Sequence, residues 1–242
     1  MRRSPLPALF TLAALAGATL GCSGTGQPEI AYQAFAAPSV PASIAAGDWT
    51  VTLDEASVAF GPAYFCAAAS GSADLCETAI GELTEIRALN LLDATPQPLG
   101  EARGLIGTIR SASYDYGVHW FFTEESPVAA EAAPGGHSAR FAGQATKGAT
   151  TLRFVADVDV IPQFQGLRAV PSAEASAVIE DRDVRLDVGF DPGAWLSKVD
   201  FDLAAPEPGS DYVIAPGSRN HGALVIAMTA QETPSFTWTK LP

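Results

Sequence analysis

Apolar and polar residues alternate along most of the chain, which is the pattern of half-buried β-strands. The alternation is clear where Trp49, Val51 and Leu53 are separated by threonines. Turns containing Gly and Pro separate many of the apolar segments, and many short strands at this spacing favour a β-sandwich or a related barrel. Strands are predicted at 29–35, 49–60, 84–92, 103–110, 117–123, 138–146, 150–160, 173–180, 183–190, 198–203, 221–229 and 235–239.

Helical spacing is best developed at residues 72–83. Ser72 can cap this segment, Asp74 lies in its first turn, and apolar residues recur at 75, 79, 80 and 83. Asp191 followed by Pro192 also predicts one helical turn over 191–195. An α/β sheet would need a helix of 10–15 residues between strands, as a rough rule. The predicted fold is therefore mainly β, a jelly-roll or immunoglobulin-like sandwich with one short helix.

The first 21 residues have the layout of a secretory signal. A short cationic segment with Arg2 and Arg3 precedes an apolar stretch at 6–15, and small residues lead to Cys22. A transmembrane helix is the alternative, but the apolar stretch is shorter than the ~20 residues that a span needs. Residues 1–21 are therefore predicted to be a signal peptide.

The segment ending at Thr19-Leu20-Gly21-Cys22 resembles the lipobox of bacterial lipoproteins. The resemblance implies cleavage before Cys22 and lipidation of that cysteine, although Thr19 stands where the family prefers leucine. It also implies that residues 22–28 are the lipidated cysteine and its tether, with one β domain at 29–242. Ser23 goes with sorting to the outer membrane in this family, so we expect a protein of the cell envelope that faces the periplasm or the cell surface.

The other two cysteines, Cys66 and Cys76, form an even pair in a domain expected to be exported, where disulfides persist. A bridge between them would staple the predicted helix to the strand before it. A pair of metal thiolates is the alternative. Zinc sites take four ligands, and no second Cys or His pair lies nearby, so the disulfide is favoured.

Charge excludes some partners. The 14 Lys and Arg residues against 27 Asp and Glu give a formal net charge of −13. Nucleic-acid binding is dominated by cations that meet phosphates, and an anionic lipid surface would repel this chain. We therefore expect no nucleic acid, and contact with the membrane only through the lipid. With 48% hydrophobic and 17% charged residues, the chain can form a core.

Motifs of common enzymes are absent from the sequence. It contains no phosphate-binding or dinucleotide-binding glycine motif, no G-x-S-x-G, no H-E-x-x-H and no calcium-binding loop. A non-catalytic binding or interaction role, with an envelope protein or a small ligand as partner, is therefore expected. An envelope hydrolase remains an alternative, for which Ser138, His137 and Asp115 can be assembled into a triad.

Three histidines, His119, His137 and His221, lie near predicted strand ends. Imidazoles from three strands could hold zinc or copper, with Asp115 as the nearest acid in sequence to His119. The alternative is that each histidine is an ordinary surface or hydrogen-bonded residue. Metal binding through these residues is therefore a second candidate function.

Aromatic residues alternate at Tyr114, Tyr116 and Trp120, with Val118 between them. Aromatic side chains that recur every second residue are predicted to be buried in the core, and an exposed binding platform is the alternative. The lipobox, the Trp-x-Val-x-Leu strand at 49–53, the cysteine pair and the runs at 184–188 and 195–201 resemble MbnP-type lipoproteins linked to copper handling. This resemblance implies a β-sandwich that binds rather than catalyses, with copper as the candidate ligand.

Overall fold

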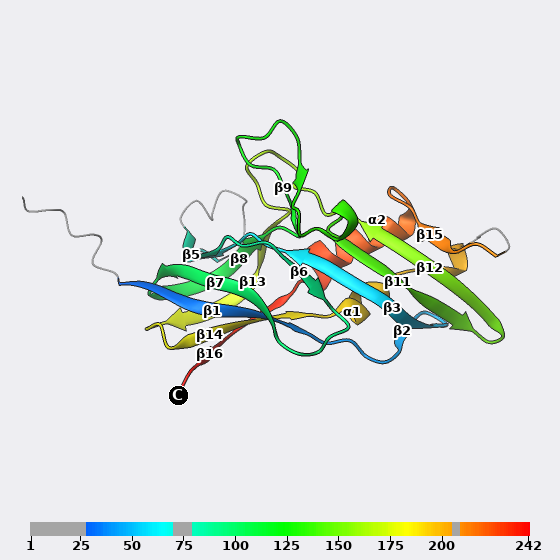
Figure 1. Cartoon of the computed structure of the whole chain (residues 1–242), viewed down its shortest axis with the longest axis horizontal. Helices are drawn as coiled ribbons and strands as arrows, with labels where there is room; N and C mark the ends of the chain where they lie inside the picture. The colour runs from blue at the N-terminus through cyan, green and yellow to red at the C-terminus, as the bar shows by residue number, and fades with distance from the viewer. Residues whose placement is uncertain (1–27, 70–78, 205–208) are drawn as a thin grey trace, which may run out of the picture.

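The computed structural model describes residues 28–69, 79–204 and 209–242 and shows two packed β-sheets (Figure 1), so the predicted mainly β, sandwich-like class is confirmed. The large sheet has the spatial order β13 (Val170–Ile179), β8 (Gly107–Tyr114), β4 (Ala63–Cys66), β5 (Ala79–Leu83), β7 (Gln97–Leu105), β1 (Glu29–Pro38), β14 (Val184–Phe190) and β16 (Ser235–Lys240). The small sheet has the order β15 (Tyr212–Ile214), β12 (Thr150–Val158), β11 (Ala139–Lys147), β3 (Trp49–Phe60) and β2 (Ile44–Ala46), and β6 (Arg87–Asn90) also pairs with β3. Two short strands, β9 (Val118–His119) and β10 (Val128–Ala129), form a separate hairpin.

The large sheet curls so that strands distant in its order meet inside it. The ring of Phe65 on β4 lies 5.2 Å from that of Trp238 on β16, measured between centroids. The Trp238 indole N–H also donates to the Tyr32 hydroxyl of β1 at 3.2 Å. The inward-facing residues of the sheet therefore share one interior, which extends to the small sheet.

Aromatic residues join the two sheets. The ring of Phe60, at the end of β3, lies 5.3 Å from the rings of Tyr114 on β8 and Phe190 on β14. Such tilted and edge-on pairs are favourable beyond the area they bury. The predicted core role of the aromatic stripe is confirmed for Tyr114 and Tyr116, which are fully buried.

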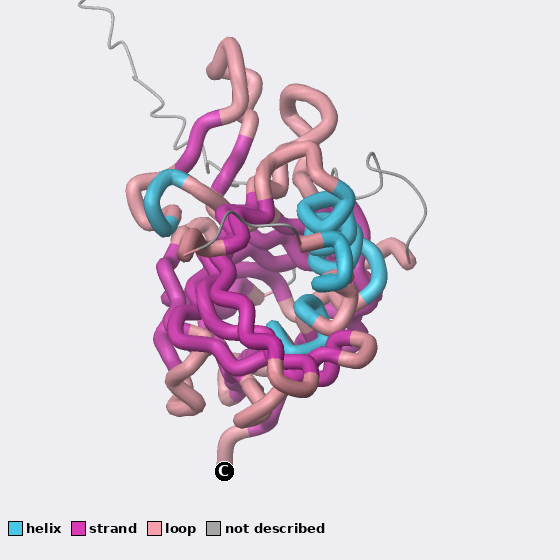
Figure 2. The backbone as a smooth tube through the Cα atoms, turned by 90° about the vertical axis from the view of Figure 1, so that its right-hand side faces the viewer, coloured by secondary structure: helices cyan, strands magenta, loops and turns pink. Residues whose placement is uncertain are grey.

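Most helical segments lie on one side of the strands, and one short turn lies on the opposite side (Figure 2). They are α1 (Pro192–Leu196), α2 (Arg219–Ile226), the 3₁₀ turns η2 (Pro134–Gly136) and η3 (Phe201–Leu203), and the π-turn η4 (Ala227–Gln231). The turn predicted at 191–195 is confirmed as α1, since the Asp191 carboxylate accepts a hydrogen bond from the Ala194 N–H at 2.9 Å. Within the described ranges, no helix has the length and apolar character that crossing a membrane requires.

Two strand predictions, 221–229 and 198–203, are wrong, and two others hold only in part. The strand predicted at 117–123 is confined to Val118–His119, and the one predicted at 103–110 is divided at Ile106 between β7 and β8. Residues 221–229 form α2 and part of η4, because the Ser218 hydroxyl caps the helix by accepting from the His221 N–H at 3.2 Å. The β-branched and apolar run 224–228 then continues as helix, in which Leu224, Ala227 and Met228 are buried. Residues 198–203 contain the turn η3 instead of a strand, since the Asp200 carboxylate accepts from the Asp202 N–H.

The predicted helix at 72–83 is wrong for its last five residues, which form strand β5. A Cβ added to Gly104 would lie 2.2 Å from the carbonyl oxygen of Ile80, so glycine at 104 permits β5 to pass close to β7. Residues 72–78 and Cys76 lie outside the described residues. Cys66 is buried at the end of β4, and its bridge to Cys76 stays a prediction.

Candidate functional site

Two loops project from the same side of the molecule, at the top of Figure 1, and we call them the crown. The first is the hairpin 118–129, in which β9 pairs with β10. The second is the segment 159–169, which connects β12 to β13. Figure 2 shows the same two loops beyond the ends of the strands, so the crown stands clear of both sheets.

Hydrogen bonds hold the two crown loops together. The side-chain amide of Gln165 donates to the carbonyl oxygens of Phe122 at 3.1 Å and Glu124 at 2.6 Å. The Gly166 N–H donates to the Trp120 carbonyl at 2.6 Å. Gly166 has φ +83°, a conformation that favours glycine, and the Phe122 ring lies against it, since an added Cβ would be 2.1 Å from that ring.

An ion pair fixes the second loop to the core. The fully buried Asp115 carboxylate accepts from the Arg168 guanidinium at 2.5 Å and from the Ala169 N–H at 2.6 Å. The guanidinium also lies over the rings of Phe121 at 4.9 Å and Tyr64 at 5.7 Å. Arg168 therefore connects the core, the second loop and the first loop.

Burial raises the pKa of Asp115 from 3.8 to about 7, because the charged carboxylate is removed from water. Arg168 and the hydrogen bond from Ala169 act in the opposite direction and favour the charged form. A carboxyl group with this pKa changes its charge near neutral pH.

Four apolar side chains of the crown face solvent. Phe122 is 81% exposed, Phe164 57%, Ile161 52% and Val128 41%. Large exposed apolar groups that gather on one feature mark interaction sites more often than chance surface residues do. The crown is therefore our candidate site, and its chemistry is that of an apolar contact surface.

His119, the first of the predicted metal ligands, lies at the base of the crown. Its Nε2 is 3.1 Å from Glu124 Oε1, and its ring is 4.4 Å from that of Phe121. Its Nδ1 is buried without a hydrogen-bond partner among the described residues. Asp115, predicted as the acid beside the histidines, instead contacts Arg168.

His137 and His221 lie near a different acid, Asp159. The Nδ1 of His137 is 2.9 Å from Asp159 Oδ1. Burial lowers the pKa of His221, while the negative charge of Asp159 raises it. The structure thus brings two of the three predicted histidines toward one carboxylate and leaves His119 apart. Among the residues described, no three His, Cys, Asp or Glu side chains are grouped closely enough to hold a metal ion.

The residues assembled for a hydrolase triad have other contacts. The Ser138 hydroxyl is buried and accepts from the Val160 N–H at 3.0 Å. His137 pairs with Asp159, and Asp115 pairs with Arg168.

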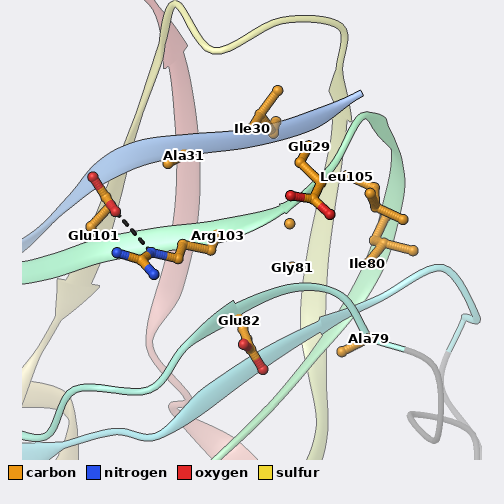
Figure 3. Close-up of a pocket in the computed structure, with 11 residues that line it drawn as sticks. Glu29, Ile30, Ala31, Ala79, Ile80, Gly81, Glu82, Glu101, Arg103 and Leu105 are labelled. Atoms are coloured by element: carbon orange, nitrogen blue, oxygen red, sulfur yellow. Dashed lines mark hydrogen bonds and ion pairs between the residues drawn. The ribbon is translucent and has the colours of Figure 1, made fainter. Parts of the chain in front are cut away.

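An open hollow of about 620 Å³ lies on the outer face of β1, β5 and β7 (Figure 3). The carboxylates of Glu29 and Glu82 lie on two of its sides, and Glu101 pairs with Arg103 at 2.9 Å. Gly81 forms part of its floor. The hollow is charged and open, in contrast to the apolar crown.

Sequence reasoning missed Asp159 and the exposed apolar residues of the crown at 122, 161 and 164. The run Trp120-Phe121-Phe122 breaks the period of two and leads directly into Thr123, Glu124 and Glu125. An aromatic run inside a polar loop is the signal that could have indicated an exposed aromatic.

Comparison with protein-family models, with curated proteins and with solved structures finds no match.

Proposed function

We propose that this protein is a lipid-anchored, non-catalytic protein of the bacterial cell envelope that binds a partner protein through the crown. The observation that carries the proposal is that a pair of interlocked loops holds Phe122 with 81% of its surface exposed. Hydration of a large apolar ring is unfavourable, and the hydrogen bonds from Gln165 and Gly166 restrict the loop that carries it.

A restricted loop favours binding for a physical reason. Association requires ordering of side chains and loops at the interface, and a loop that is already ordered loses less entropy. Aromatic side chains that enter a pocket of the partner account for much of the binding energy in many interfaces. Phe122 and Phe164 have the chemistry and the exposure of such residues.

The membrane attachment is proposed from the sequence of residues 1–28. The lipobox resemblance gives Cys22 as the lipidated residue and residues 22–28 as the lipidated cysteine and its tether. Cys22→Ser should release the protein from the membrane fraction. A Cys22→Ser variant that still sediments with membranes after a carbonate wash would refute the lipid attachment.

Binding through the crown is tested by photo-crosslinking in cells. A photoreactive phenylalanine at position 122 should give a discrete adduct with one partner. The same group at Val213, which is 62% exposed on the small sheet, is the matched control and should give none. Absence of an adduct at 122, or the same adduct at both positions, would contradict a binding role of the crown.

Zinc or copper binding is the second candidate function, and it is favoured by the shared proximity of His137 and His221 to Asp159. Imidazole and carboxylate groups are ligands for either ion. The structure does not group these three side chains closely enough to hold one, so binding requires them to move together. Zinc and copper(II) are titrated into the exported Cys22→Ser chain. His137→Ala and His221→Ala should each weaken binding at least tenfold, whereas His119→Ala should leave it unchanged. Equal affinity in all three variants would exclude this site.

A further inference from the structure

The crown carries exposed negative charge and no exposed positive charge. The crown hairpin 118–129 includes Glu124 and Glu125 but no Lys or Arg, and Glu131 follows two residues after it. The Glu124 carboxylate pairs with the His119 ring, whereas Glu125 and Glu131 are exposed to solvent. In the second loop the one cation is Arg168, whose guanidinium is buried against Asp115. The surface presented to a partner is therefore apolar at its centre and acidic at its side.

The crown is also convex. Phe122 rests on Gly166 along one side of its ring and is otherwise exposed, and Phe164 and Ile161 project from the adjoining loop. Side chains that project in this way bury most area in a concave apolar surface.

We infer that the partner of the crown is a protein with an apolar socket rimmed by Lys or Arg. This inference rests on the proposed function and adds the chemistry of the partner. Charge complementarity determines which surfaces associate, since juxtaposed like charges are unfavourable.

Three other kinds of binding partner fit the charge of the crown less well. An anionic bilayer would be repelled by Glu125, Glu131 and the net charge of −13. A second copy of the chain would bring the same acidic side chains together. Nucleic acid would be repelled in the same way.

The inference is tested with three defined probes and the exported Cys22→Ser chain. The probes are an amphipathic 14-residue peptide of Leu and Lys, its counterpart of Leu and Glu, and vesicles of phosphatidylcholine and phosphatidylglycerol at 3:1. Peptide binding is measured by fluorescence anisotropy, vesicle binding by co-sedimentation, and self-association by sedimentation velocity. Circular dichroism verifies that each variant is folded.

The Leu/Lys peptide should bind, and Phe122→Ser should weaken its binding at least tenfold. The double variant Glu125→Gln/Glu131→Gln should weaken it several-fold, and raising the NaCl concentration from 50 to 300 mM should weaken it in the parent. Two matched controls, Val178→Ser at an exposed position of β13 and Glu29→Gln/Glu82→Gln in the hollow, should change it less than twofold.

Different failures identify different errors. Equal weakening by the control variants would overturn the inference, because the peptide would then recognise overall charge. Binding of the Leu/Glu peptide or the vesicles through Phe122, or association of the chain with itself through Phe122, would also overturn it, while the crown would keep its binding role. If no probe binding depends on Phe122, the inference fails. If the photo-crosslink at 122 is also absent, the proposed function fails with it.

Discussion

The two ends of the Asp115–Arg168 ion pair should respond unequally to mutation. Asp115→Ala leaves the guanidinium of Arg168, whose side chain is only 9% exposed, without its anion. An arginine cannot lose its proton in a protein. Arg168→Met leaves a carboxyl group that can take up a proton and become neutral. We therefore expect Asp115→Ala to be the more destabilising change.

The magnitudes follow from burial. Removing one partner from a buried ion pair typically destabilises a protein by about 3–5 kcal/mol, which for a domain of this size lowers Tm by about 6–20 °C. Arg168→Met should destabilise by about 1–3 kcal/mol, the usual consequence of leaving a neutral buried polar group without a partner. The double variant should be less destabilised than the sum of the two single variants, because the groups are in contact.

Chemical denaturation at pH 8, above the pKa of Asp115, measures these free energies of unfolding. Hydrogen–deuterium exchange supplies a local readout, since Asp115→Ala should also increase exchange at residues 159–169. Equal destabilisation by the two single variants, or additive destabilisation in the double variant, would refute the reasoning.

Three further outcomes are expected. Because the pKa of Asp115 is raised from 3.8 to about 7, the folded chain retains a proton that the unfolded chain has lost between these pH values. The free energy of unfolding of the parent, measured relative to that of Asp115→Asn, should therefore fall as the pH rises from about 4 to about 7. A rise in this difference with pH would contradict the raised pKa. Gly104→Ala should destabilise the chain by about 1–3 kcal/mol through overpacking, whereas Gly222→Ala, with no atom within 4 Å of the added Cβ, should not destabilise it; denaturation curves distinguish the two. The expected bridge at Cys66 predicts that alkylation of the exported chain without reductant labels neither this thiol nor its partner, as measured by mass, and two labelled thiols would exclude the disulfide.

Alternation predicted the strands well because each strand buries one face. In β11 and β12, alternate residues from Ala139 to Val158 are buried in the core, as the period of two requires. It failed at 221–229, because an unbroken apolar run has no period that distinguishes a strand from a helix. There the Ser218 cap favours the helix that the structure shows. Helical spacing, from which a helix was predicted at 72–83, failed at 79–83, where the close approach of β5 to β7 depends on Gly104, a residue distant in sequence.

The candidate site was less predictable than the fold for a related reason. Asp159 meets His137 across 22 residues, and Arg168 meets Asp115 across 53. No local spacing encodes such contacts, because the path of the chain between strands determines them. The exposed Phe122 depends on support from Gly166 and Gln165 of a different loop, so its sequence neighbours alone could not indicate whether the ring is buried or displayed.

The position of Asp115 explains how the crown can be ordered although it stands away from both sheets. Its neighbours Tyr114 and Tyr116 are fully buried in the aromatic core. Its N–H donates to the Pro62 carbonyl, and its own carbonyl accepts from the Gly61 N–H, both at 3.0 Å. The carboxylate that holds Arg168 therefore extends from backbone that the core fixes on both sides. Because the core restricts Asp115, and Asp115 restricts the second loop, covering Phe122 with a partner requires little further ordering of the crown.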